Sequence, residues 1–396
     1  MKRMLALVAV LLAAVDLSYA RHAKLDALGQ EIVAIVRDHF YDPKKGAAWA
    51  AAHDHYGAAA MDPDGFIRTT REGLAELKVS HTAYYTPADP QYFGLLSIFH
   101  EALEVDSAEV ESIGADVTGE GFVRVVFPGG PAEAGGVRRG DRIVRADGRP
   151  FEPIRSFKGR AGRAVLLSVQ RARDAGPVEI KVTPRKIDPG REWLDAQIKG
   201  SRVIERKGER IAYAPLFSCA GEQYMEGLQE ALGGSLRGAR ALVLDFRDGW
   251  GGCNPDFVNL FNDAVPVLTS IGRDGKAQVF DAQWRESVFI LINGGTRSGK
   301  EVVSYALQQR RRATLVGARS AGAVMGGRCF LLSDRSLLYL AVADSRVNGK
   351  RLEGIGVQPD VEVRDDLPYA AGSDPQLEKA LDLAAQSAAS RKGKRD

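Results

Sequence analysis

The sequence predicts an α/β core with a largely parallel, helix-covered sheet, together with a compact β-rich module and a small helical N-terminal region. Three observations support this fold class. Beyond about residue 187, apolar runs of strand length alternate with helical patterns. Between residues 114 and 184, short strands are separated by glycine turns. Before residue 80, two segments repeat apolar residues at helical spacing.

The first twenty residues have the pattern of a signal peptide. Lys2 and Arg3 precede an apolar run that ends at Val15, and small residues follow up to Ala20. We therefore expect cleavage near Ala20 and an exported protein, periplasmic or secreted. An uncleaved membrane anchor is the alternative. The apolar run is short for a bilayer span, and no later segment reads as one, so we expect no membrane span after cleavage.

Composition describes an ordinary soluble protein. The 396 residues are 45% hydrophobic and 27% charged, and the formal net charge of +3 gives no reason to expect nucleic acid as a partner. The length leaves room for two or three domains. We expect residues 386–396, which end in a short basic run, to form a flexible tail.

Cys219, Cys253 and Cys329 are the cysteines of the chain. An odd number in an exported protein allows one disulfide and a free thiol, or three buried cysteines. Their spacing matches no zinc motif, so we expect no metal site, and no cofactor is implied.

The N-terminal region, 21–104, is expected to hold helices at 25–40 and 66–77. The module that follows, 105–186, has predicted strands at 123–127, 164–170 and 178–182, with a further strand and two turns in the segment GDRIVRADG.

The α/β core is predicted to span residues 187–385. Its expected strands and helices alternate as a parallel sheet requires. The predicted strands are 210–215, 241–246, 288–292, 313–316 and 336–341, and helices are predicted at 221–232, from 257 and at 301–307.

Ser298 lies where the strand 288–292 gives way to a helix. At such a turn a hydroxyl is exposed, and the free N–H groups of the helix start can stabilise an oxyanion. A second interpretation is available, because Ser298 to Glu301 also fits a capping box, S-x-x-E. The segment therefore indicates a nucleophile or a helix cap.

Any histidine base must come from the N-terminal region. All six histidines lie within the first hundred residues, at positions 22, 39, 53, 55, 81 and 100. His81 is the best candidate, since it follows a helix and precedes Tyr84 and Tyr85. A structural role for His81 is the alternative.

The segment PGGPAEAGGVRRGDRIVRADGRP, which begins at Pro128, resembles a PDZ domain of the bacterial protease type. The resemblance implies that residues 105–186 bind the C-terminus of an extended peptide at an open sheet edge. By position, the carboxylate-binding loop would lie near Gly114, Ala115, Asp116 and Val117. A PDZ fold used only as a spacer is the alternative.

Four motifs occur in one order along the chain. They are Ser80-His81-Thr82-x-Tyr84, Asp245-x-Arg247 with Gly251-Gly252, the Ser298 turn, and Glu353-Gly354-x-Gly356-Val357-x-Pro359-Asp360. With the inserted module, they resemble the tail-specific, or C-terminal-processing, serine peptidase family. The resemblance implies polypeptide substrates.

That family has two branches with different bases. In the Ser–Lys branch a lysine ends the motif that corresponds to residues 317–323, where this chain has Ala323. The chain is more similar to the branch of the tricorn protease core, for which the resemblance implies a Ser–His–Ser–Glu tetrad. Ser298 would be the nucleophile and His81 the base, while Ser80 and Glu353 would orient the imidazole.

The oxyanion hole would combine the N–H of Gly299 with a backbone N–H of the Gly251-Gly252 turn. Two departures from the family pattern stand out. Gly249 replaces an asparagine, and Arg297 and Lys300 place cations beside Ser298. The cations favour an acidic substrate group, or make Lys300 an unusual base, although the helix direction should point Lys300 away.

The sequence thus predicts an exported serine endopeptidase that acts on unfolded or C-terminally exposed polypeptides. The main alternative is a PDZ-containing, peptide-binding protein that keeps the fold without turnover. A third interpretation is an acyl-transfer enzyme or esterase that uses the same site.

Overall fold

The computed structural model describes residues 22–281 and 283–392. The predicted signal peptide, residues 1–20, and the last four residues of the predicted tail lie outside these ranges. The described chain forms two compact units. The first unit contains residues up to 95, 101–104 and 325–345, and the second contains 96–100, 105–324 and 346 onward.

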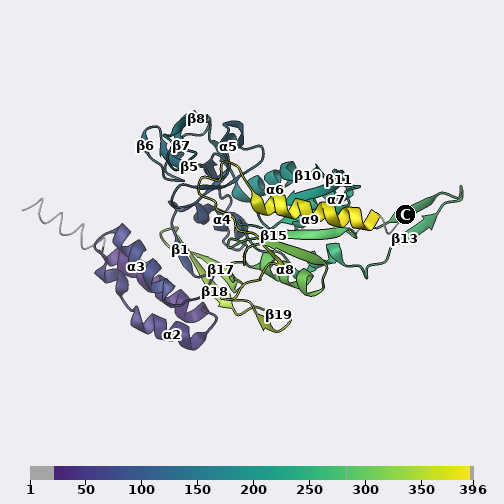
Figure 1. The fold of residues 1–396 in the computed structure, drawn as a ribbon. Coiled ribbons are helices and arrows are strands. Elements are labelled where there is room, and N and C mark those ends of the chain that lie inside the picture. Colours follow the sequence, from purple (N-terminus) through teal and green to yellow (C-terminus); the bar gives the residue numbers. More distant parts are fainter. Residues whose placement is uncertain (1–21, 282, 393–396) are drawn as a thin grey trace, which may run out of the picture. The chain divides into compact units, whose positions relative to one another are not determined.

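The first unit combines N-terminal helices with a three-stranded antiparallel sheet (Figure 1). Residues 22–39 are helical, and the apolar side chains Ile32, Val36 and Phe66 are buried against those of the sheet. The elements of this unit are α2 (Pro43–Ala52), η1 (Tyr56–Ala59), α3 (Pro63–Ala75), β1 (Ala83–Tyr85), β17 (Gly326–Leu331) and β18 (Leu337–Ala343), and α4 (Pro90–Ile98) carries residues of both units.

The predicted strand 336–341 is β18, and its placement in the α/β core was wrong. It pairs with β1, where Tyr84 lies opposite Leu338, and its apolar side chains pack with the N-terminal helices. A strand's membership of a sheet depends on long-range pairing, which the local pattern of Ser336 to Ala341 does not specify.

A six-stranded sheet forms the centre of the second unit, in the order β10-β11-β12-β15-β16-β21. All neighbours are parallel except β10 and β11. The strands are β10 (Arg202–Arg206), β11 (Glu209–Pro215), β12 (Ala241–Asp245), β15 (Ser287–Ile292), β16 (Ala313–Gly317) and β21 (Val361–Glu362). The predicted parallel-rich sheet is therefore present, and its central strands are apolar on both faces, as burial on both faces requires.

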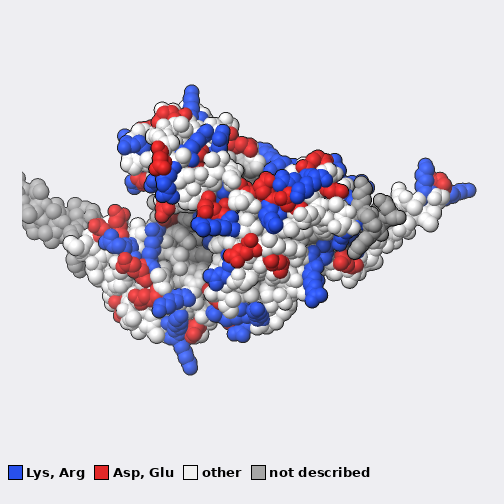
Figure 2. Space-filling view, viewed as in Figure 1, with Lys and Arg blue, Asp and Glu red and all other residues white. Residues whose placement is uncertain are grey.

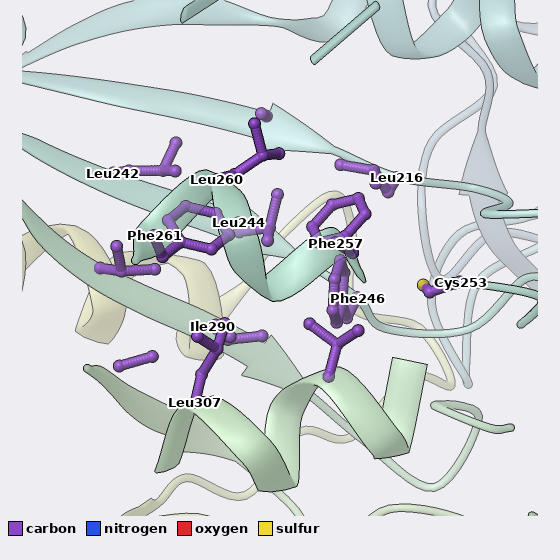
Figure 3. Close-up of a cluster of buried hydrophobic side chains, with 14 of the residues drawn as sticks. Leu216, Leu242, Leu244, Phe246, Cys253, Phe257, Leu260, Phe261, Ile290 and Leu307 are labelled. Atoms are coloured by element: carbon purple, nitrogen blue, oxygen red, sulfur yellow. The ribbon is translucent and has the colours of Figure 1, made fainter. Parts of the chain in front are cut away.

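Helices cover both faces of this sheet. On one face, Phe246 after β12 and Phe257 and Leu307 from the helices form a buried cluster (Figure 3). On the other face, the alanine-rich side of α9 packs on β11, β12 and β15. The helices are α6 (Pro189–Gly200), α7 (Glu222–Gly233), the 3-10 helix η2 (Pro255–Phe261), α8 (Gly299–Gln309) and α9 (Pro375–Lys392).

Helix α9 extends into the predicted tail. Residues 386–392 are helical, because Ala384, Ala385 and Ala388 are buried against the sheet and extend the apolar stripe. The irregular tail expected from residue 386 is therefore wrong over 386–392.

Residues 110–187 form the β-rich segment, with its own apolar cluster that includes Val123, Ile143 and Leu167. Its four-stranded sheet has the order β6-β5-β7-β8, and two further pairs, β2-β9 and β3-β4, complete it. The elements are β2 (Val110–Ser112), β3 (Ala115–Val117), β4 (Val123–Val126), α5 (Pro131–Ala134), β5 (Arg142–Ala146), β6 (Arg149–Pro150), β7 (Val165–Gln170), β8 (Val178–Val182) and β9 (Arg185–Ile187).

A hairpin of β13 (Leu268–Ile271) and β14 (Ala277–Phe280) is exposed along its whole length. Figure 2 shows it mostly white, with charged residues at its turn. The remaining short pair is β19 (Arg346–Val347) with β20 (Lys350–Arg351). Among the described helices, none combines the length and the apolar character of a membrane span.

Candidate active site

Ser298 stands between β15 and α8, as the sequence predicted. Its backbone has φ 55° and ψ −129°, a conformation that costs a non-glycine residue about 1–3 kcal/mol. The preceding turn is fixed by Thr296, whose hydroxyl donates to the carbonyl of Phe246 at 3.0 Å and accepts from the N–H of Asn293 at 3.0 Å. The fold thus holds a serine in a strained turn at the carboxyl end of a buried parallel strand.

Glu301 ties this turn to a second loop. Its buried carboxylate accepts from the backbone N–H of Ser298 at 3.1 Å, from those of Gly322 and Ala323 at 2.7 and 2.8 Å, and from the hydroxyl of Ser320 at 2.6 Å. Burial raises the pKa of Glu301, while these hydrogen bonds oppose the rise. The predicted capping box is therefore present in both halves, since the side chain of Ser298 also accepts from the backbone N–H of Glu301. The box occupies the N–H of Ser298 and leaves a nucleophilic role for the hydroxyl compatible with the cap.

The predicted oxyanion glycines lie against the serine turn. A Cβ on Gly251 would lie 2.5 Å from the Cβ of Ser298, and a Cβ on Gly299 would lie 2.4 Å from the backbone nitrogen of Cys253. Gly252 has φ +87°, and a Cβ there would meet the Cα of Ala220 at 2.6 Å. Only glycine allows these backbones to approach so closely. Gly299 opens α8, so its N–H has no acceptor within the helix.

Glu353 is buried in the second unit, and its carboxylate accepts from the N–H of Val324 at 2.8 Å. The next residue, Gly354, donates its N–H to the carbonyl of Gly322 at 2.8 Å. Glu353 is thereby anchored on the loop that also binds Glu301. The structure brings Ser298, Glu353 and the three glycines into the second unit.

Ser80 and His81 belong to the first unit. The hydroxyl of Ser80 lies 2.8 Å from Nδ1 of His81, so the serine orients the imidazole. The ring of His81 packs against Tyr339 of β18 at 5.2 Å between centroids, and its backbone has φ 56°. In the tautomer that donates Nδ1–H to Ser80, the lone pair of the imidazole lies on Nε2.

Lys300 lies in the interior of the second unit. It is fully buried, and its ammonium donates to the carbonyls of Leu216 at 2.6 Å and Asp248 at 2.9 Å. The prediction that Lys300 forms part of a cationic patch for acidic substrates was wrong, because burial removes it from the surface. Arg297 is exposed.

Gly249 is at a position that requires glycine. Its φ is +65°, and a Cβ would lie 2.2 Å from the carbonyl oxygen of Phe217. A side chain at position 249 would therefore collide with the backbone that follows β11, which explains the glycine.

The cysteines resolve into one disulfide, Cys219–Cys253, and a buried free thiol, Cys329. Burial raises the pKa of the Cys329 thiol, which makes it unreactive. The N–H of Cys219 also donates to the carbonyl of Gly251 at 3.0 Å. The disulfide thus joins the two segments beside the serine turn, a pairing that cysteine spacing alone could not reveal.

The residues expected to form a carboxylate-binding loop, 114–117, are arranged differently. Ala115, Asp116 and Val117 form β3, which pairs with β4, and only Gly114 lies outside the strand. The carboxylate of Asp116 accepts both hydrogen bonds of the Arg124 guanidinium, at 3.0 and 2.9 Å. Three of the four residues therefore lie in a paired strand and not in a loop, while Gly114 lies in the bend that precedes it, and its place in a carboxylate-binding loop stays a prediction.

The motif Asp245-x-Arg247 has a structural role at the end of β12. The buried guanidinium of Arg247 pairs with Asp245 and with Asp374, which precedes α9, each at 2.7 Å. Burial would lower the pKa of Arg247, but Asp245 and Asp374 together raise it well above its ordinary value. The network joins the strand that leads to Gly251 to the C-terminal helix.

Residues 210–363 match the model of peptidase family S41. Carboxyl-terminal-processing proteases are similar over much of the chain. That of Picosynechococcus sp. is 26% identical over 72% of this chain and 72% of its own length, and that of Bartonella bacilliformis is 29% identical over 66% and 63%. A tricorn protease homologue of Streptomyces coelicolor is 27% identical over 88% of this chain and 31% of its own. The matches support a serine-type peptidase.

Two solved structures show the same fold. The photosystem II D1 C-terminal processing protease aligns with a TM-score of 0.51 and 23% identity, over 89% of this chain and 98% of its own. The tricorn protease aligns with a TM-score of 0.58 and 17% identity, over 93% of this chain and 37% of its own. At these identities the likeness concerns the fold.

Proposed function

We propose that this chain is an exported serine endopeptidase that cleaves unfolded or C-terminally exposed polypeptides. The observation that carries the proposal is the strained Ser298 turn, against which Gly251 and the helix-opening Gly299 are packed at distances that only glycine allows. Such a turn presents a hydroxyl beside N–H groups that can receive the negative charge of a tetrahedral intermediate.

In the proposed mechanism, Ser298 attacks the scissile carbonyl and transfers its proton to His81. The N–H of Gly299 and a backbone N–H of the Gly251-Gly252 turn stabilise the oxyanion. His81 then protonates the leaving amine, and water hydrolyses the acyl-enzyme by the same route. Ser80, which contacts Nδ1 of His81 at 2.8 Å, orients the imidazole, and Glu353 stabilises the charged state.

The proposed chemistry is tested with a fluorophosphonate probe on the purified mature protein. We expect the wild type to be labelled and Ser298→Ala to be unlabelled. His81→Ala should reduce the labelling rate by about 10³-fold or more, because the serine loses its base. Folded wild-type protein that stays unlabelled contradicts the peptidase proposal and supports the peptide-binding alternative.

The base is tested by pH. A histidine base acts only when neutral, so we expect the rate to fall as the pH drops below about 6–7. Activity that survives in His81→Ala would contradict the assignment of this base.

We further propose that residues 105–186 are a PDZ domain that captures the substrate's C-terminus. The support is a compact β-rich segment with its own apolar cluster, which can accept a peptide strand at a sheet edge. Fluorescence anisotropy with Ser298→Ala tests this: a labelled peptide with a free C-terminus should bind, and the same peptide with an amidated C-terminus should not. Equal affinities would contradict carboxylate capture.

Export rests on the pattern of residues 1–20. Expression in a Gram-negative host should give a periplasmic product whose N-terminal sequence begins at Arg21. An uncleaved, cytoplasmic product would contradict it.

A further inference from the structure

Lys300 is a buried lysine with no role in the proposed proton transfers. It is the second residue of α8 and is fully buried, with the ring of Phe246 5.9 Å from its ammonium. Burying a charged group costs several kcal/mol unless hydrogen bonds compensate it. Backbone carbonyls that accept hydrogen bonds from Lys300 provide this compensation.

The two carbonyls that accept from Lys300 lie at the start of the segments that follow the neighbouring strands β11 and β12. The carbonyl of Leu216, 2.6 Å from Nζ, follows β11, and that of Asp248, 2.9 Å from Nζ, follows β12. Farther along the chain, the same two segments are joined by the hydrogen bond from Trp250 N–H to the carbonyl of Phe217 at 2.9 Å. The disulfide Cys219–Cys253 joins them again. Lys300 therefore adds a further link between these two segments, through its hydrogen bonds to both.

The segment 248–253 carries the second of the two proposed oxyanion donors. Its Gly251 packs on Ser298, and its Cys253 packs on Gly299, both at distances below ordinary van der Waals contact for an added Cβ. The N–H of Gly299 is part of α8, whereas the second donor is part of the segment 248–253. The separation of the two donors therefore depends on how that segment is held to the first turn of α8, and Lys300 joins them directly.

We propose that Lys300 is a positioning residue that fixes the oxyanion-hole segment, residues 248–253, against the nucleophile helix. This inference rests on the proposed function and adds a residue to which the family resemblance assigns no role. Displacing a donor by about 1 Å costs on the order of 10²-fold in rate, so the effect should appear in kcat.

The test compares Lys300→Met with Arg312→Met as a matched control. The guanidinium of Arg312 is also largely buried and donates to backbone carbonyls, those of Phe261 at 2.9 Å and Glu286 at 3.0 Å, beyond the far end of α8. Both variants remove hydrogen-bond donors from backbone carbonyls, but only Lys300→Met releases the segment 248–253.

For Lys300→Met we expect a kcat about 100-fold below the wild type with KM within threefold, and faster hydrogen exchange in peptides that cover 248–253. For Arg312→Met we expect kcat per folded molecule within threefold of the wild type and no change in that exchange. A Lys300→Met enzyme with kcat within threefold of the wild type overturns the proposal, as does equal loss of kcat in both variants.

If Lys300→Met does not fold, Lys300→Gln takes its place, since its amide can donate to one carbonyl. It should lose about tenfold in kcat, and a loss below threefold overturns the proposal. If the folded wild type neither turns over peptides nor reacts with the probe, the proposed function fails, and hydrogen exchange alone decides: unchanged protection of 248–253 on removal of Lys300 overturns the positioning role.

Discussion

Gly251 and Ser298 lie so close that a methyl group on the glycine would stand 2.5 Å from the Cβ of the serine. The two residues come from loops that follow adjacent strands, β12 and β15. Their contact joins the proposed nucleophile to its proposed oxyanion site through backbone packing alone, so the geometry of the site is set by the absence of a side chain.

Gly251→Ala is expected to displace Ser298 and to lower kcat by about 10²-fold or more, since the reacting groups lose alignment. The rate of fluorophosphonate labelling measures this. The matched control is Gly294→Ala in the same region, because no heavy atom of the described chain lies within 4 Å of a Cβ there. Equal labelling of Gly251→Ala and the wild type would contradict the close packing.

Restoring the family's asparagine at position 249 is expected to harm this protein. Asparagine tolerates a positive φ, but its Cβ would lie 2.2 Å from the carbonyl oxygen of Phe217. We expect Gly249→Asn to lower the free energy of unfolding by about 1–3 kcal/mol, measured by chemical denaturation. A stabilised or more active variant would show that the glycine is a defect rather than a requirement.

Because of Lys300, the free energy of unfolding should depend on pH between about 7 and 10.5. Burial lowers its pKa to about 7 from 10.5, while Asp245 and Asp248 oppose the shift and Arg297 adds to it. Between these values the unfolded chain binds a proton that the folded chain does not, so stability rises with pH across that window. The gain in the free energy of unfolding from deprotonating Lys300 is complete above pH 10.5 and is lost as the pH falls to about 7.

We therefore expect the free energy of unfolding of the wild type, relative to Lys300→Met, to increase by about 1.4 kcal/mol per pH unit between about pH 7.5 and 9.5. Urea denaturation at three pH values measures the difference. Parallel curves would show that the lysine keeps its charge throughout, which its two carbonyl contacts would then have to support.

Removing the disulfide should affect both stability and activity. It closes a loop with a sequence separation of 34, for which loop-closure entropy gives a stabilisation of about 3–4 kcal/mol. We expect Cys219→Ala with Cys253→Ala to lower Tm and to slow labelling, because the segment that carries Gly252 loses its cross-link. Iodoacetamide applied to the native, unreduced protein serves as the control: buried Cys329 should not react, and activity should persist.

The sequence was most informative where burial is continuous. The runs Ala241 to Phe246 and Val288 to Ile292 predicted β12 and β15, because strands covered on both faces are apolar at every position. The Ser298 turn was found for the same reason, since the break in such a run is sharp. A breaker following a buried run marks the end of the strand to within a residue.

Predictions failed where the answer depends on distant partners. Helical direction alone said that Lys300 should point away from the reaction, but not that carbonyls eighty-four and fifty-two positions away would enclose it. Asp116 looked available for a loop because its partner Arg124 is recognised only once β3 and β4 are paired. These contacts are products of tertiary packing, which a local pattern does not encode.

The first unit is discontinuous in sequence, and this limits which truncated forms of the protein can fold. Its sheet needs β17 and β18, which the chain supplies more than two hundred residues after β1. A recombinant fragment starting at residue 105 would expose Leu338 and Leu340, which are fully buried beside the N-terminal helices. Domain-deletion work should therefore remove residues 325–345 together with the N-terminal segment, replacing them by a short linker between Val324 and Arg346.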